Sequence, residues 1–168
     1  MTVLVAYASK YGATKEIAEK IADVLVDAGL KTELHPVEEI RDLAGVEAVI
    51  LGSAVYIGQW RQEAAEWLKN YQEPLSRLPV WLFSSGPTGE GDPSELMQGF
   101  TFPEALKSAA DHIQPRAIAF FHGVLDRNKL SIGERAIVRM LKAPVGDFRN
   151  WDSITAWAGR IARELSRS

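Results

Sequence analysis

The sequence contains no cysteine among its 168 residues. This absence excludes a disulfide scaffold, a zinc–thiolate site, an iron–sulfur cluster and a cysteine nucleophile. The three histidines, His35, His112 and His122, do not have the spacing of metal ligands, so we expect no metal site. No stretch reaches the roughly 18 consecutive apolar residues of a membrane-spanning helix, and the first residues lack the basic segment of a signal peptide. We therefore expect a soluble, cytoplasmic protein.

Neither sign of charge is in large excess: 19 Lys and Arg oppose 22 Asp and Glu, for a formal net charge of −3. This balance lacks the basic face that is typical of nucleic-acid binding, so we expect no such partner. The charge is unevenly distributed: residues 1–115 contain 9 basic and 17 acidic side chains, and residues 116–168 contain 10 and 5. The chain length is that of one domain, so we expect residues 1–168 to form a single unit.

Short apolar runs alternate with amphipathic stretches along the chain. The pattern predicts strands at residues 3–8, 32–35, 46–52, 80–83 and 117–121, and helices at residues 14–28, 61–72, 103–112, 131–143 and 152–166. This alternation predicts an α/β fold, a doubly wound five-stranded parallel sheet of order 2-1-3-4-5 with helices on both faces. Ligands bind at the carboxyl ends of such strands, so the loops 9–14, 53–59 and 84–92 are expected to converge there. The Gly- and Pro-rich segment 86–102 is expected to be a long loop, which functions as a lid or faces the substrate, with surface disorder as the alternative.

The first of these loops is Ser9-Lys10-Tyr11-Gly12-Ala13-Thr14, between a strand and a helix. Two hydroxyls flank a glycine that lets the backbone approach a ligand, and the helix start offers free N–H groups. These features suit a single phosphate. The spacing matches neither a P-loop nor a dinucleotide fingerprint. An ordinary N-capping loop explains the same residues equally well.

The second loop places two large aromatic side chains among small residues. Tyr56 is the candidate for stacking on a flat heteroaromatic ring, whereas Trp60 is expected to pack inward. The third loop, residues 84–92, offers small residues and backbone amides that suit hydrogen bonds to the edge of the same ring.

The first loop resembles the phosphate loop of flavodoxins, Ser/Thr-x-Thr-Gly-x-Thr, with Tyr11 in place of the middle Thr. The second loop, together with Gly146-Asp147 and a final helix containing Trp151 and Trp157, resembles the menaquinone-dependent protoporphyrinogen IX dehydrogenase family and its flavodoxin-domain relatives. The resemblance implies a flavodoxin-like fold with FMN as the cofactor. It implies that the phosphate is held by Ser9, Lys10, Tyr11, Gly12, Ala13 and Thr14, that the isoalloxazine is lined by Ser53, Ala54, Val55, Tyr56, Ile57 and Gly58, and that its other edge is covered by Ser84, Ser85, Gly86, Pro87, Thr88 and Gly89.

The resemblance favours an FMN-dependent oxidoreductase with a quinone or a redox protein as partner. A flavodoxin-type electron carrier is the first alternative, and the unusual Tyr11 leaves a flavin-free binding module as the second. His122 is a candidate proton shuttle, although a hydrogen-bonded structural histidine is the more common case. The segment 86–104 has four acidic residues and no Lys or Arg. The dehydrogenases have a basic loop there, so this charge argues against a porphyrinogen substrate.

The segment 127–142 interleaves basic and apolar residues at helical spacing. A basic amphipathic helix can lie on an anionic membrane surface. We favour the alternative, a helix packed on the core with a solvated outer face.

Overall fold

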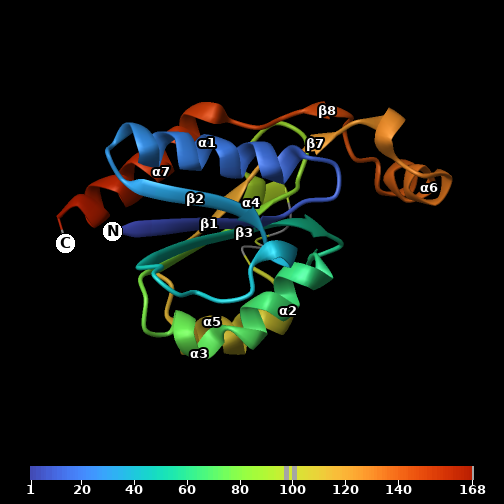
Figure 1. Ribbon diagram of the computed structural model, residues 1–168. Helices are drawn as coiled ribbons and strands as arrows, with labels where there is room; N and C mark the ends of the chain where they lie inside the picture. The colour runs from blue at the N-terminus through green and yellow to red at the C-terminus, as the bar shows by residue number, and fades with distance from the viewer. Residues whose placement is uncertain (97–98, 100–101, 168) are drawn as a thin grey trace.

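A parallel sheet forms the centre of the protein in the computed structural model, which describes residues 1–96, 99 and 102–167 (Figure 1). Its strands are β1 (Thr2–Ala8), β2 (Lys31–Pro36), β3 (Ala48–Tyr56), β5 (Val80–Ser85) and β6 (Ala117–Phe121). They are all parallel and lie in the order β2-β1-β3-β5-β6. The five main strands thus confirm the predicted order 2-1-3-4-5. Three two-residue strands accompany them: β4 (Gln59–Trp60), which pairs with β3, and the pair β7 (Val124–Leu125) and β8 (Gly146–Asp147).

Helices cover both faces of the sheet, as Figure 1 shows. On one face lie α1 (Ala13–Asp27) and α7 (Trp151–Ser166), and on the other lie α2 (Gln62–Asn70), α3 (Gln72–Leu75) and α5 (Lys107–Ile113). Because the three inner strands are buried on both sides, each face has its own apolar core. Ile21 of α1 and Ile161 of α7 belong to one core, and Leu68 of α2 belongs to the other. No described helix has the length and apolar content needed to cross a membrane.

Several elements differ from their predicted bounds. Strand β3 continues to Tyr56 because Val55 pairs with Trp60 of β4 and Ala54 pairs with Ser85 of β5. The helix predicted at 61–72 is divided at Tyr71 into α2 and α3. The helix predicted at 103–112 begins as a 3-10 turn, Glu104–Leu106. The expected loop 86–102 contains α4 (Pro93–Leu96), and residues 97–98 and 100–101 of it lie outside the described residues.

The helix α6 (Ile132–Leu141) stands apart from the sheet, beyond the ends of the strands (Figure 1). None of its residues is buried, so the expectation of a core-packed helix is wrong. A local feature supports it instead: Ser131 and Glu134 form a capping box in which each side chain accepts a hydrogen bond from the other residue's backbone N–H. Strands β7 and β8 flank this helix in the sequence, and their pairing holds together the two ends of the segment between them, residues 126–145.

Candidate functional site

A cavity of about 930 Å³ lies at the carboxyl ends of the central strands. Ten of the predicted site residues line it: Ser9, Lys10, Tyr11, Ala13, Thr14, Ala54, Val55, Tyr56, Ser85 and Gly86. The three predicted loops therefore converge on one site. The volume is within the usual range for small-molecule and cofactor sites.

The other predicted residues, Gly12, Ser53, Ile57, Gly58, Ser84, Pro87, Thr88 and Gly89, are not part of the cavity lining. Two of them support the wall from behind. The Ser53 hydroxyl accepts a hydrogen bond from the Arg61 backbone N–H at 3.0 Å, and the Ser84 hydroxyl accepts one from Trp60 Nε1 at 2.8 Å. Trp60 is 5% exposed, which confirms that its side chain packs inward.

The third predicted loop turns away from the cavity immediately after Gly86. The Gly123 N–H donates to the Pro87 carbonyl at 2.9 Å, which draws the loop onto the chain leaving β6. The two backbones approach so closely that a Cβ on Gly123 would lie 2.9 Å from the Gly86 carbonyl oxygen. The described part of the segment after Gly86 does not line the cavity, and its role as a lid stays a prediction.

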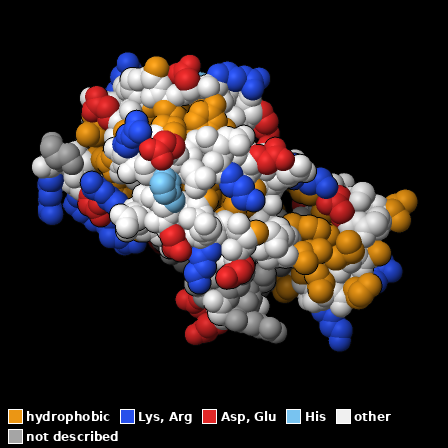
Figure 2. Space-filling model, turned by 90° about the horizontal axis from the view of Figure 1, so that it is seen from below, with side chains coloured by type: hydrophobic (Ala, Val, Ile, Leu, Met, Phe, Trp, Pro, Cys, Tyr) orange, Lys and Arg blue, Asp and Glu red, His pale blue; other side chains and the backbone are white. Residues whose placement is uncertain are grey.

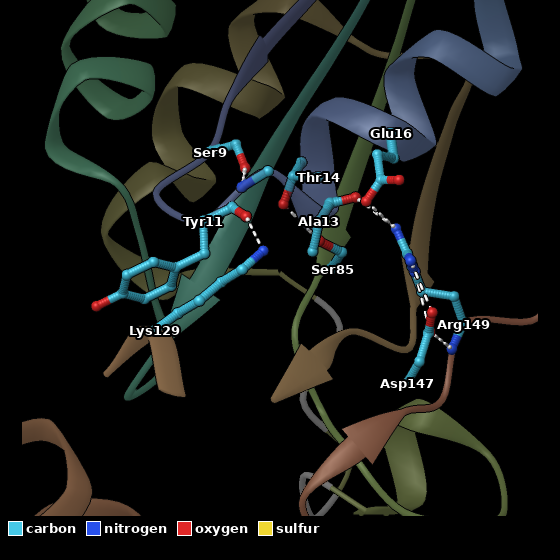
Figure 3. A network of polar contacts seen from close by, with 10 residues as sticks. Ser9, Tyr11, Ala13, Thr14, Glu16, Ser85, Lys129, Asp147 and Arg149 are labelled. Carbon is cyan, nitrogen blue, oxygen red and sulfur yellow. Dashed lines mark hydrogen bonds and ion pairs between the residues drawn. The ribbon is translucent and has the colours of Figure 1, made fainter. Parts of the chain in front are cut away.

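The β1–α1 loop has the geometry of an anion site, as Figure 3 shows. Gly12, at φ 92°, is the N-cap of α1, and its N–H donates to the Ser9 hydroxyl at 3.0 Å. No side chain caps the helix, so the amides of the first turn are left available for a ligand. The Thr14 and Ser85 hydroxyls are 2.8 Å apart and join this turn to β5. Free amides, the helix dipole and small side chains together fit a phosphate group.

Arg149 lies beside the same turn, although the sequence analysis did not select it (Figure 3). Its side chain is 8% exposed, and it donates to both carboxylate oxygens of Asp147, at 3.0 and 2.7 Å. It also donates to Glu16, at 3.1 Å, and to the Ala13 carbonyl, at 3.3 Å. The guanidinium lowers the pKa of Asp147, and the carboxylate raises the pKa of Arg149. Arg149 thus fixes β8 to the start of α1 and places a cation at the cavity wall.

Glu134 connects α6 to the phosphate loop. Its carboxylate accepts hydrogen bonds from the Lys10 ammonium, at 2.8 Å, from the Tyr11 hydroxyl, and from the Ser131 N–H, at 3.1 Å. These donors lower its pKa to about 2, the Lys10 bond having the largest effect. Lys129 adds a bond to the Tyr11 carbonyl at 3.3 Å (Figure 3). Tyr11, the residue that replaces threonine in this loop, therefore contacts the segment 126–145, which contains α6.

The segment after β6 completes the cavity, and the sequence analysis did not place it there. Leu125, Leu130, Ile137 and Val138 all line the wall on that side. The predicted topology could have indicated this segment, because the chain that leaves the fifth parallel strand emerges at the same edge of the sheet as the other loops. His122 does not line the cavity, and its buried Nε2 has no hydrogen-bond partner among the described residues. The hydrogen bond expected for a structural histidine is therefore not found at Nε2, and the proton shuttle stays a prediction.

Residues 4–151 match the family described as a flavodoxin domain. The chain belongs to this family. Its cofactor is therefore FMN, and the free amides at the start of α1 fit the phosphate of that group. Membership confirms the coarser prediction, an FMN-type electron carrier or oxidoreductase. A flavin-free binding module is not supported.

Solved structures of several flavodoxins share this fold. A cysteine-to-serine mutant of the flavodoxin from Pseudomonas aeruginosa superposes with a TM-score of 0.62 at 15% identity, over 99% of each chain. Flavodoxin 1 from Bacillus cereus gives 0.63 at 11% identity, over 98% of this chain and 99% of its own. Rubredoxin oxygen:oxidoreductase from Desulfovibrio gigas gives 0.66 at 14% identity, over 99% of this chain and 36% of its own. No curated protein sequence matches the chain.

Among the described residues, no group of three or more His, Asp or Glu side chains is placed to hold a metal ion.

Proposed function

We propose that this flavodoxin-family protein is an oxidoreductase that transfers electrons between an organic substrate and a quinone-type acceptor. The main observation in support is that the cavity extends to α6, because Ile137 and Val138 of this helix line it together with Tyr56. An electron carrier exchanges electrons at an open surface, whereas a small substrate is bound best in an enclosed apolar site. Bound FMN supplies the redox chemistry, in one- or two-electron steps.

The residues of this chain bind and orient the reactants. The β1–α1 loop holds the phosphate, and Tyr56, a residue that is 49% exposed and lines the cavity, offers its ring for stacking on a flat ring system. The side chains of Ile137 and Val138 exclude water from the opposite wall. In the proposed reaction the substrate loses two electrons and two protons. The quinone gains two electrons and two protons and becomes a quinol.

The charges at the cavity wall are largely paired, which suits a neutral ring such as a quinone. Lys10 pairs with Glu134, and Arg61 pairs with Glu63. None of the four carboxylates in the acidic segment 86–104 lines the cavity, so they do not contact a ligand bound there. Protoporphyrinogen therefore belongs among the electron donors to be tested.

A flavodoxin-type carrier is the second candidate. It is supported by the shared fold with flavodoxins and by the half-exposed ring of Tyr56 at the cavity edge. The two candidates differ in the acceptor they reduce, so a direct comparison separates them.

The test is stopped-flow oxidation of the reduced holoprotein by a menaquinone analogue and, in parallel, by a ferredoxin-type protein. We expect faster reaction with the quinone. The double variant Ile137→Ala/Val138→Ala should slow quinone reduction about tenfold while retaining FMN, because it removes apolar contacts to a small ligand. Val26→Ala, an exposed position on α1, is the matched control. Fast oxidation by the protein partner with no reaction with quinone would establish the carrier instead.

A further inference from the structure

We propose that α6 and the turn after it, residues 132–145, form a docking surface for an anionic lipid bilayer. This inference does not depend on the reaction proposed above. Four large apolar side chains of this segment project into solvent: Ile132 is 87% exposed, Met140 80%, Leu141 65% and Val145 45%. Figure 2 shows hydrophobic side chains gathered on the lobe that α6 forms, with Lys and Arg at its margin. A monomer rarely exposes such a group of apolar side chains without a binding role.

The two sides of α6 have different surroundings. Ile137 and Val138 line the cavity, so that side faces the protein. Ile132, Ala136 and Met140 follow one another at intervals of four residues, are all exposed, and therefore form one outward stripe. The helix has ten residues and is about 15 Å long, enough to lay this stripe along a flat surface.

The outward side is also positively charged. Arg135 and Arg139 lie one turn apart beside the apolar stripe, and Lys142 caps the helix. In the described part of the chain, neither Arg139 nor Lys142 forms an ion pair. The acidic residue of the helix, Glu134, is turned toward the phosphate loop by Lys10. These two cations thus have no acidic partner among the residues that the structure describes, and the surface is complementary to an anionic partner.

A bilayer fits this surface better than a folded acidic protein. The apolar side chains project from a convex helix, and lipid accommodates them without a matching groove. Long Arg and Lys stems can lie along the apolar layer while their charges reach the headgroups. Residues 1–115 carry 17 acidic against 9 basic side chains, so an anionic membrane repels that part of the protein. Contact through α6 would then orient the cavity end toward the lipid.

The test is co-sedimentation of the FMN-loaded protein with phosphatidylcholine vesicles that contain or lack phosphatidylglycerol, at low and high salt. We expect binding to the anionic vesicles that salt weakens. Arg139→Gln/Lys142→Gln should weaken it about 25-fold, at roughly fivefold for each cation near the surface. Ile132→Ser/Met140→Ser should weaken it about tenfold through lost apolar contact.

The matched controls lie on the body of the protein, by which we mean the central sheet and the helices that cover it. Lys31→Gln/Lys69→Gln removes the same charge, and Val26→Ser removes an apolar side chain that is 55% exposed on α1; neither should change vesicle binding. FMN content and circular dichroism verify that every variant is folded. The proposal is overturned if anionic vesicles do not bind, or if the body variants weaken binding as much as the α6 variants. Retention on a heparin column that Arg139→Gln/Lys142→Gln abolishes, without vesicle binding, would overturn it in favour of a soluble acidic partner.

Discussion

The Glu134 carboxylate lies 2.8 Å from the Lys10 ammonium, although 124 residues separate them in the chain. The contact joins the phosphate loop to a helix that has no buried residue of its own. Because the same carboxylate also accepts from the Tyr11 hydroxyl, the loop holds α6 at two points. The position of α6 over the cavity therefore depends on a polar attachment and on local capping rather than on an apolar core.

We predict that Glu134→Gln loosens α6. Glutamine cannot pair with the Lys10 charge, and hydrogen bonds to charged groups are the stronger ones. Amide hydrogen exchange in residues 132–141 should become about tenfold faster at neutral pH. Glu66→Gln, at an exposed position of α2, is the control. Unchanged exchange in Glu134→Gln would show that the helix cap at Ser131 and the β7–β8 pair hold α6 in place without the Lys10 ion pair.

The attachment should also depend on pH in a defined direction. The pKa of Glu134 is about 2 in the folded protein, below its usual 4.5. The ionised carboxylate therefore stabilises the attachment above pH 4.5, and this contribution is lost as the pH falls through about 2. Exchange in α6, corrected for its intrinsic pH dependence, should show a transition in this window. Glu134→Gln should remove it, and a transition that persists in the variant would assign the effect to another group.

Tyr11→Thr should separate cofactor binding from the attachment of α6. Threonine restores the residue of the flavodoxin pattern, so FMN should still bind. The shorter side chain cannot reach Glu134, so α6 should exchange faster and quinone reduction should slow about tenfold through the poorer enclosure. Fluorescence titration with FMN and stopped-flow kinetics measure the two effects. Loss of FMN with intact α6 protection would contradict this division of roles.

Gly123→Ala should disturb the site at the carboxyl end of β6. Its Cβ would lie 2.9 Å from the Gly86 carbonyl oxygen, which is backbone and cannot rotate away. Overpacking of this kind costs about 1–3 kcal/mol. Urea unfolding should show this loss, and FMN affinity should fall because Gly86 and Gly123 line the cavity. Gly159→Ala, in the middle of α7, should instead stabilise the protein slightly.

Ile57→Asn should stabilise the protein by about 1 kcal/mol. Ile57 has φ 50°, a left-handed conformation that strains a β-branched side chain and that asparagine tolerates. It is 65% exposed, so little apolar burial is lost on substitution. Urea unfolding of the FMN-free protein measures the change. A lower stability would mean that the isoleucine side chain contributes packing that outweighs the strain.

The sequence alone determined the sheet, and its resemblance to flavodoxins implied the cofactor. Continuous apolar runs such as Val3–Ala8 mark strands that are buried on both faces, and their alternation with amphipathic stretches leaves few possible topologies. The loop from Ser9 to Thr14 predicted a phosphate site because it depends on local backbone geometry. Local patterns of this kind can be read without knowing what packs against them.

The tertiary structure decided which residues surround the cavity. Ser53 and Ser84 lie in predicted site loops, yet their hydroxyls bond to Arg61 and Trp60 behind the wall. Arg149 and Glu134 reach the phosphate loop from more than 120 residues away, and no local pattern encodes such a distance. The helical period of 131–143 predicted α6 but not its surroundings. Amphipathicity shows which residues share a side of a helix, whereas only the packed fold shows whether that side meets the core, a cavity or solvent.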